Sequence, residues 1–232
     1  MTARARASRP SGAAMRFDGV PPATIVLVRH GETALTVSRE LSGSSVPGPP
    51  LSAAGRVQAA QAADAVHRIG RESWPDLPYP SRVLASPMVR TQETAAAIGR
   101  RIGQHVEPEP AFAEAHFGDW EGLSTEVVEA RWPGQLQRFY TDPGFAVPGG
   151  ESMADIGVRV EAALTEVAAQ GTDATPVVVS HVMAIRAALG ITMGLPPAAW
   201  TWQRILPTSL SVVRFWPDGM RELVAAGVPP VR

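Results

Sequence analysis

The sequence contains no cysteine and no lysine among its 232 residues. The absence of cysteine excludes disulfide bonds, zinc–thiolate sites and thiol catalysis. Without lysine, all 21 basic residues are arginines, which excludes Schiff-base chemistry and the lysine of a Walker A phosphate-binding loop. A preference for arginine over lysine is typical of a GC-rich genome and by itself indicates no function.

Long apolar runs and a strong net charge are also absent. No apolar run approaches the roughly 18 residues that a membrane-spanning helix needs, so we expect no membrane partner. The formal net charge is -1, which argues against a nucleic-acid partner. Hydrophobic residues make up 45% and charged residues 19% of the chain, a composition that can form a packed core and argues against global disorder.

Residues 1–22 are expected to be a disordered tail that ends at Pro21 and Pro22. The first part of this tail is rich in Arg, Ala and Ser and lacks the apolar segment of a secretory signal. A basic targeting tail and an extension upstream of an internal start at Met15 both stay open. We expect a cytoplasmic protein with one domain over residues 23–232, which includes a small helical or lid insertion around residues 123–151.

Two short apolar runs, Thr24–Val28 and Pro176–Ser180, predict buried parallel strands. Further strands are predicted at residues 82–85, 106–109, 209–215 and 221–224. Helices are predicted from Ser52 to about Ile69, from Ser86-Pro87 to about Ile102, in two pieces between Thr125 and Tyr140, from Ser152 to about Ala169, and from Val182 to about Met193. In the first helix, Val57, Ala60, Val66 and Ile69 form the stripe predicted to face the core. This alternation predicts a three-layer α/β/α sandwich with a mostly parallel central sheet.

Both apolar strands run directly into a histidine, His30 after the first and His181 after the second. Ligands of open α/β sheets bind at the carboxyl ends of such strands, so both histidines are expected to face one pocket. Arg29 precedes His30, and Arg90 lies in the first turns of a helix, where the helix dipole also favours an anion.

Three chemistries suit two histidines. A metal site is disfavoured, because the cation Arg29 stands beside His30 and no spacing typical of metal ligands is present. Acid–base catalysis alone leaves the arginines without a role. Attack of a histidine on phosphorus gives both the histidines and the arginines a role, because arginine binds phosphoryl oxygens in bidentate fashion.

Phosphoryl transfer also needs a proton for the leaving oxygen. Five carboxylates in the predicted loops are candidates, and the pattern alone does not choose among them: Glu32, Glu114, Asp119, Glu121 and Glu151. Glu151 and Ser152 fit either a lid over the site or the cap of the following helix. Trp120 is expected to pack in the interior.

The run Leu27-Val28-Arg29-His30-Gly31-Glu32-Thr33 resembles the signature of the histidine phosphatase superfamily, which has the phosphoglycerate mutase-like fold. Five later stretches resemble further motifs of that family in the same order: residues 51–59, 86–95, 114–122, 149–152 and 179–181. The resemblance covers roughly residues 23 to 225. It is nearest to the small-molecule phosphatases of the α-ribazole phosphatase and broad-specificity kinds.

The resemblance implies that His30 is the nucleophile and becomes phosphohistidine. It implies that Arg29, Arg90 and His181 bind the phosphoryl group, and that Glu114 protonates the leaving oxygen and then activates water. It implies no metal and no cofactor. The other pocket residues it suggests are Thr36, Arg39, Ser42, Gly43 and Val182. Three of these depart from the family's pattern, which often has Asn, Gln and Gly at positions 36, 42 and 182.

We therefore expect a metal-independent phosphomonoesterase that acts on a small phosphorylated metabolite. The short path from Glu114 to Gly122 resembles the phosphatases, because the cofactor-dependent mutases carry a longer insertion there. A cofactor-dependent mutase and a non-catalytic phosphate-binding module stay open as alternatives. The identity of the substrate and the assembly, for which a homodimer is one option, also stay open.

Overall fold

The computed structural model describes residues 19–172 and 175–230, so nearly all of the predicted tail, residues 1–22, lies outside the described residues. Within this part of the chain, six strands form one sheet in the order β3-β2-β4-β1-β5-β6. The strands are β1 (Ala23–Arg29), β2 (Pro80–Ala85), β3 (Val106–Pro108), β4 (Thr175–Ser180), β5 (Leu210–Phe215) and β6 (Arg221–Val228). The first four are parallel to one another, β5 pairs antiparallel with β1, and β6 pairs antiparallel with β5.

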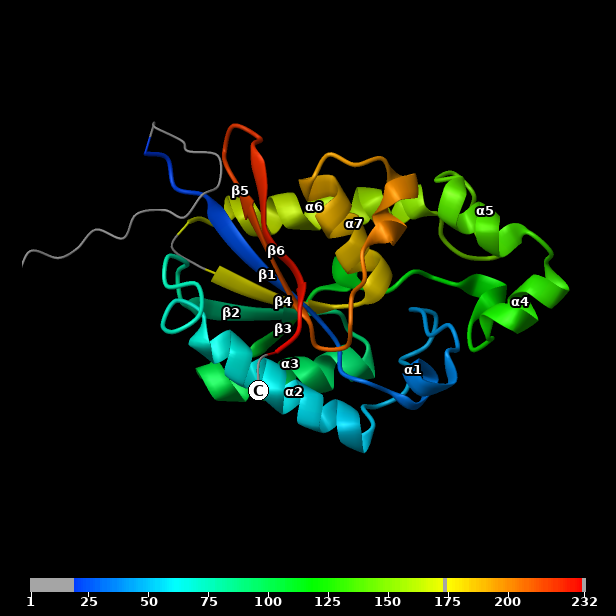
Figure 1. The fold of residues 1–232 in the computed structure, drawn as a ribbon, viewed down its shortest axis with the longest axis horizontal. Helices are drawn as coiled ribbons and strands as arrows, with labels where there is room; N and C mark the ends of the chain where they lie inside the picture. Colours follow the sequence, from blue (N-terminus) through cyan, green and yellow to red (C-terminus); the bar gives the residue numbers. More distant parts are fainter. Residues whose placement is uncertain (1–18, 173–174, 231–232) are drawn as a thin grey trace, which may run out of the picture.

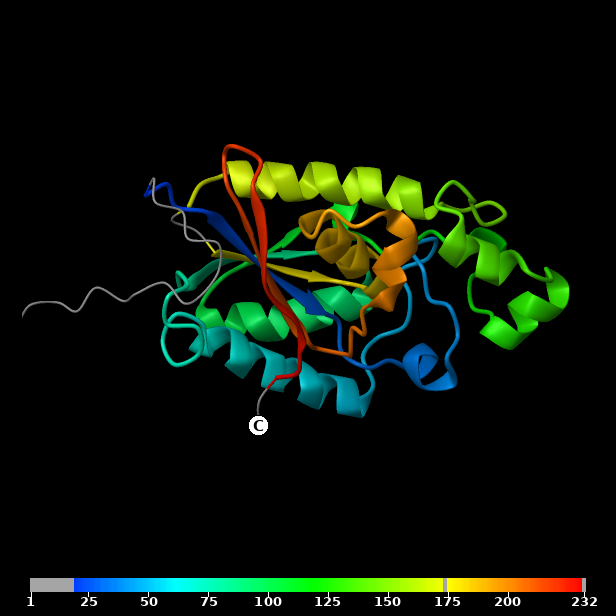
Figure 2. The same cartoon turned by 45° about the horizontal axis from the view of Figure 1, so that its top comes forward.

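Helices cover both faces of this sheet, as the alternation of elements predicted. Figure 2 shows α2 (Ala53–Arg68) and α3 (Val89–Ile102) on one face, and α6 (Met153–Ala169) and α7 (Val182–Thr192) on the other. The short helices α1 (Ala34–Ser38), α4 (Thr125–Arg131) and α5 (Gln135–Thr141) lie beyond the strand ends (Figure 1). The predicted three-layer α/β/α fold with a mostly parallel sheet is confirmed. No helix among the described residues has the length and apolar character needed to span a membrane.

Strand β1 is continuously apolar from Ile25 to Val28 because both of its faces are buried there. Ile25 and Leu27 belong to the core under α6 and α7, whereas Val26 and Val28 belong to the core under α2 and α3. Residues two apart in a strand share a face, so the continuous apolar run serves two cores at once. This explains why the run reads as a central strand rather than an edge strand.

Three local predictions about helices are wrong. Val66 and Ile69 of the predicted stripe are buried. Val57, however, is 60% exposed and Ala60 is also exposed, because the rest of the buried stripe of α2 consists of small residues. Alanines on this stripe let α2 approach α3 closely, a packing signal that a search for large side chains misses. Helix α3 begins at Val89, so Pro87 precedes the helix rather than standing in its first turn. The long loop after β1 contains helix α1, which was not predicted.

The segment around residues 123–151 contains two short helices separated near Pro133, as predicted. Its inner side is anchored by aromatic rings. Trp120 is fully buried and its ring centroid lies 6.0 Å from that of Phe139 on α5. Trp120 therefore packs in the core, as expected, and supports this insertion where it joins the sheet.

Candidate active site

The two strand-end histidines lie side by side. Strands β1 and β4 pair in parallel with Arg29 opposite Ser180, and the His30 amide donates to the Ser180 carbonyl at 3.0 Å. The ring centroids of His30 and His181 are 5.2 Å apart, with 56° between the ring planes. Parallel pairing of two strands that end at the same level thus places both imidazoles in one site.

One nitrogen of His30 is held in a defined protonation state. Its Nδ1 lies 2.7 Å from the carbonyl oxygen of Gly31. Because a carbonyl oxygen only accepts hydrogen bonds, Nδ1 carries the proton and Nε2 retains its lone pair. Burial, and then the charges of Arg29 and Arg90, lower the pKa of His30 well below 6.5. The ring is therefore neutral at neutral pH, the nucleophilic form.

A close backbone contact fixes the turn that follows His30. A side chain at Gly31 would place its Cβ 2.6 Å from the carbonyl oxygen of Gly55, and a Cβ at Gly55 would collide with the carbonyl oxygen of Glu32. The chain after β1 therefore rests directly on the first turn of α2. This contact holds the Gly31 carbonyl where it meets the imidazole of His30.

The second histidine is aligned by a hydroxyl. His181 Nε2 lies 2.8 Å from Ser86 Oγ, which follows strand β2. Its Nδ1 is buried and has no hydrogen-bond partner among the described residues. When the Ser86 hydroxyl donates to Nε2, Nδ1 carries a proton and is available to donate to a ligand. No role for Ser86 was predicted from the sequence; its position four residues before Arg90 was the available signal.

Two arginines, Arg90 buried and Arg29 partly buried, keep unused donors. Arg29 donates through one terminal nitrogen to the Ile205 carbonyl at 2.8 Å, and Arg90 donates to the carbonyls of Ser42 and Gly43 at 2.8 and 3.1 Å. Within the described part of the chain, no carboxylate forms an ion pair with either guanidinium, and Arg29 Nε and Arg90 Nε and NH1 have no partner. Burial lowers the pKa of Arg29 to about 10 and also lowers that of Arg90. Buried cations with free donors form a site for an anion.

Among the five candidate carboxylates, Glu114 lies in the site. One of its oxygens accepts from the amides of Ala115 at 2.9 Å and Met183 at 3.1 Å. Burial raises the pKa of Glu114, and these amides and the two arginines oppose that rise. A raised pKa keeps the carboxyl protonated to a higher pH than an exposed glutamic acid, as a general acid requires. Glu121 instead accepts from Gly43 and Ser45, and Glu151 pairs with Arg159.

A cavity of about 190 Å³ opens onto these groups. Its lining consists of Arg29, His30, Thr33, Thr36, Glu40, Leu41, Ser42, Glu114, Phe117, Tyr140, Val182, Met183 and Arg186. The predicted pocket residues Thr36, Ser42 and Val182 are among them. The Ser42 hydroxyl is buried without a partner among the described residues, whereas the Thr36 hydroxyl joins Thr33 in the capping box of α1.

Two other predicted pocket residues do not line the cavity. Gly43 stands behind the lining, where its carbonyl accepts from Arg90 and its amide donates to Glu121. Arg39 is exposed, and the geometry does not support its predicted contact with substrate. Because residues 34–38 form a helix, Arg39 ends that helix in a left-handed conformation with φ of 60°.

Arg186 and Tyr140 line the cavity and were not predicted from the sequence. Arg186 lies on α7 and donates to the Gln203 carbonyl at 2.9 Å. Burial raises the pKa of Tyr140, and the charge of Arg186 opposes this rise. Since Arg186 stands four residues after Val182, it shares a helix face with a predicted pocket residue, and that spacing was the available signal.

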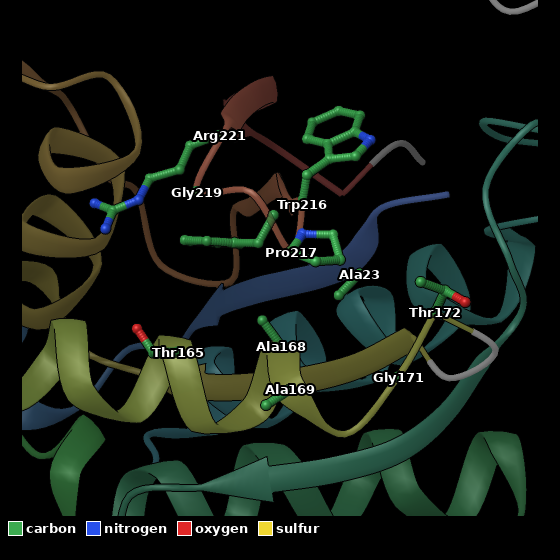
Figure 3. Close-up of a pocket in the computed structure, with 11 residues that line it drawn as sticks. Ala23, Thr165, Ala168, Ala169, Gly171, Thr172, Trp216, Pro217, Gly219 and Arg221 are labelled. Carbon is green, nitrogen blue, oxygen red and sulfur yellow. The ribbon is translucent and has the colours of Figure 1, made fainter. Parts of the chain in front are cut away.

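A larger hollow of about 450 Å³ lies at the other end of the strands and carries little chemistry (Figure 3). Its lining includes Ala23, Ala168, Phe215 and Trp216. The titratable group in the lining, Arg221, is paired with Glu161 at 2.6 Å. No group of three or more metal-ligating side chains occurs among the described residues.

A neutral histidine with a free Nε2, arginines without an ion-pair partner and a carboxyl whose pKa is raised by burial define a site suited to phosphoryl transfer. The model of the histidine phosphatase superfamily (branch 1) matches residues 25–226. The chain belongs to this superfamily, and it is an enzyme of the phosphatase type.

Individual relatives agree with this assignment. The chain is 34% identical over 194 residues to the probable phosphoglycerate mutase GpmB from Yersinia enterocolitica, a match that spans 82% of this chain and 84% of that protein. It is 31% identical to a glucosyl-3-phosphoglycerate phosphatase from Mycolicibacterium vanbaalenii over 76% of each chain. The solved structure of mycobacterial glucosyl-3-phosphoglycerate phosphatase Rv2419c with VO3 is similar, with a TM-score of 0.78, 27% identity, and coverage of 89% of this chain and 99% of that one.

Proposed function

We propose that the protein is a metal-independent phosphomonoesterase that works through phosphohistidine on His30. In the first step, the lone pair of His30 Nε2 attacks phosphorus while the bond from phosphorus to the ester oxygen breaks. Glu114 gives its proton to that leaving oxygen, so an alcohol departs. Arg29, Arg90 and the Nδ1–H of His181 bind the oxygens of the phosphoryl group and stabilise the charge that they carry.

In the second step, the Glu114 carboxylate takes a proton from a water molecule that attacks phosphorus. The bond from phosphorus to His30 Nε2 breaks, which returns the neutral imidazole and releases inorganic phosphate. Glu114 is again protonated and the cycle closes. One carboxyl serves as acid and then as base, because each step leaves it in the state that the next step needs.

The observation that carries this proposal is the protonation state of His30. Its Nδ1 donates to the Gly31 carbonyl, and its pKa is lowered, so Nε2 is a neutral nucleophile beside two cations. A histidine that only bound phosphate would present a donating nitrogen to it, as proposed for His181 Nδ1, rather than a lone pair. The Nε2 lone pair therefore supports a role for His30 as the nucleophile rather than as a residue that only binds phosphate.

The substrate that we propose is a small phosphorylated metabolite with a polar remainder. The cavity beyond His30 contains the polar side chains of Arg186, Tyr140 and Glu40, which suit hydroxyl or anionic groups. A relative with 31% identity is named a glucosyl-3-phosphoglycerate phosphatase, which supports such a remainder. We also propose that the α4–α5 insertion, which supplies Tyr140, acts as a lid, and that the enzyme works in the cytoplasm.

The test is hydrolysis of p-nitrophenyl phosphate near neutral pH in the presence of a chelator, with wild type and His30→Ala measured side by side. Wild-type turnover that survives the chelator and falls by more than about 10³-fold in His30→Ala is expected, because no other residue replaces a covalent nucleophile. Turnover that the variant retains would exclude the phosphohistidine mechanism. Turnover that the chelator abolishes would exclude a metal-independent reaction.

A mutase is the second candidate, because a relative with 34% identity is named a probable phosphoglycerate mutase. A mutase would return the phosphoryl group to an alcohol rather than to water. It would depend on a bisphosphorylated primer and would retain phosphate on the product. Release of inorganic phosphate in proportion to consumed ester, without a primer, favours the phosphatase.

A further inference from the structure

Arg159 on α6 uses every hydrogen-bond donor of its guanidinium group. It donates to the carbonyl oxygens of Ala111 at 2.8 Å, Ala113 at 2.9 Å and Glu114 at 3.1 Å. The two remaining donors bind the carboxylate oxygens of Glu151 at 2.8 and 3.0 Å. An arginine has five N–H donors, so all are engaged, and three of them hold the main chain that carries the catalytic carboxyl.

Glu151 forms hydrogen bonds to the main chain on the other side of Glu114. Its carboxylate accepts from the His116 amide at 2.9 Å, and its own amide donates to the His116 carbonyl at 2.9 Å. The main chain from residue 111 to residue 116 is thus held at both ends by one ion pair. Neither Arg159 nor Glu151 lines the cavity at His30.

Close packing does not support the outer side of this segment. A surface hollow of about 390 Å³ lies there, lined in part by Ala113, His116, Glu151 and Arg159. The inner side of the segment is packed, because Phe112 and Ala115 belong to the core. On the outer side, hydrogen bonds from Arg159 add to this packing, and the half-buried pair is held in a bidentate geometry, which adds orientation as well as energy.

We propose that the Arg159–Glu151 pair is a positioning device for the acid of the reaction, an inference that rests on the proposed function of Glu114. The Glu114 side chain reaches two amides, those of Ala115 and Met183, from a main chain that Arg159 and Glu151 hold in place. Misplacement of a catalytic group by about 1 Å costs on the order of 10²-fold in rate. Loss of the pair therefore impairs proton delivery more than it impairs attack by His30.

The test compares kcat/KM for p-nitrophenyl phosphate, whose leaving group needs little protonation, with that for glycerol 2-phosphate, an alkyl ester that needs a proton. This parameter reports the first chemical step, so hydrolysis of phosphohistidine does not enter it. Arg159→Met is expected to lower kcat/KM for the alkyl ester about 10- to 100-fold more than for the aryl ester. Arg159→Lys, with three donors at most, and Glu151→Gln are expected to fall between wild type and Arg159→Met.

Arg221→Met is the matched control, because Arg221 also pairs with a glutamate of α6, Glu161, but lies away from residues 111–116. It should leave the ratio of the two esters unchanged. In the Glu114→Gln background, Arg159→Met should add less than about threefold for the alkyl ester, since the proton is already missing. If thermal melting shows that Arg159→Met does not fold, the same comparison of the two esters is made with Arg159→Lys.

An equal loss for both esters, or effects of Arg159→Met and Glu114→Gln that multiply, would overturn the positioning role and leave the proposed function intact. Absence of His30-dependent turnover in the wild type would instead overturn the proposed function, and the inference with it.

Discussion

Two hollows lie at opposite ends of the parallel strands, and they differ in charge more than in size. The larger hollow, of about 450 Å³, is lined mainly by apolar side chains, and its arginine is paired with a glutamate. The smaller one, of about 190 Å³, contains Arg29 and Arg186 and adjoins Arg90. Within the described residues, none of these three arginines forms an ion pair. Cations without counterions, rather than volume, therefore mark the end of the sheet where an anion binds.

The largest expected effect that separates the two ends is on catalysis. Arg90→Met should lower kcat/KM for p-nitrophenyl phosphate about 10²- to 10³-fold, because it removes prearranged donors to the phosphoryl oxygens. Arg221→Met, at the other hollow, should stay within about twofold of wild type. Steady-state kinetics on both variants checks this contrast, and comparable losses would mean that the charge difference does not locate the chemistry.

The second effect is stabilisation by the anion. Inorganic phosphate at about 100 times its Kd should raise the free energy of unfolding by about 2.7 kcal/mol, since it supplies the missing counterion. The measurement is urea unfolding with phosphate and with sodium chloride of equal ionic strength. Arg90→Met should show a much smaller gain from phosphate, and Arg221→Met the full gain. An equal gain in all three proteins would point to a salt effect rather than a site.

The smallest effect is the pH dependence that the buried histidines cause. His30 and His181 have lowered pKa values in the folded protein. Below pH 6.5 these two histidines therefore bind protons in the unfolded chain but not in the folded protein. Stability therefore falls as the pH drops below 6.5, by at most about 1.4 kcal/mol per pH unit for each histidine. The raised pKa of Glu114 acts in the opposite direction, because the folded protein then holds a proton that the unfolded chain has lost.

Urea unfolding at pH 7.5, 6.5 and 5.5 measures this dependence. His30→Gln should reduce the slope below pH 6.5, whereas His105→Gln, at an exposed position, should leave it unchanged. The contribution of Glu114 is common to all three proteins and cancels in the comparison. A slope that His30→Gln does not alter would show that the pKa of His30 is not lowered in the folded protein.

The fold and the centre of the site were accessible from the sequence because their signals are local. Apolar runs that end in His30 and His181 report two buried strands and the edge at which they stop. The resemblance then singled out Glu114, and the structure places it beside the two arginines. His30 and His181 directly follow buried strands, where sequence and geometry are tightly linked, whereas Glu114 lies in a loop and was indicated by the resemblance alone.

Other features of the fold and the site could not be predicted, because they produce no recognisable pattern in the sequence. The buried stripe of α2 consists mainly of alanines, whose close packing a search for large side chains cannot detect. Arg39 was expected at the pocket from the resemblance, but it ends helix α1, which was not predicted, and it is exposed. Arg159 binds main-chain carbonyls 45 to 48 residues away in the sequence, and any residue has such a carbonyl, so composition and spacing carry no trace of that contact.

Because of the backbone contact between Gly31 and Gly55, the two halves of the pocket differ in how many substitutions they tolerate. Neither glycine accepts a side chain, because its Cβ would meet a carbonyl oxygen, so the half built on residues 29–33 cannot diversify. The half built on α5 and α7 is formed by side chains such as Tyr140, Val182 and Arg186, which can be exchanged without moving His30. A library for new substrates would therefore vary those three positions and leave the turn after β1 untouched.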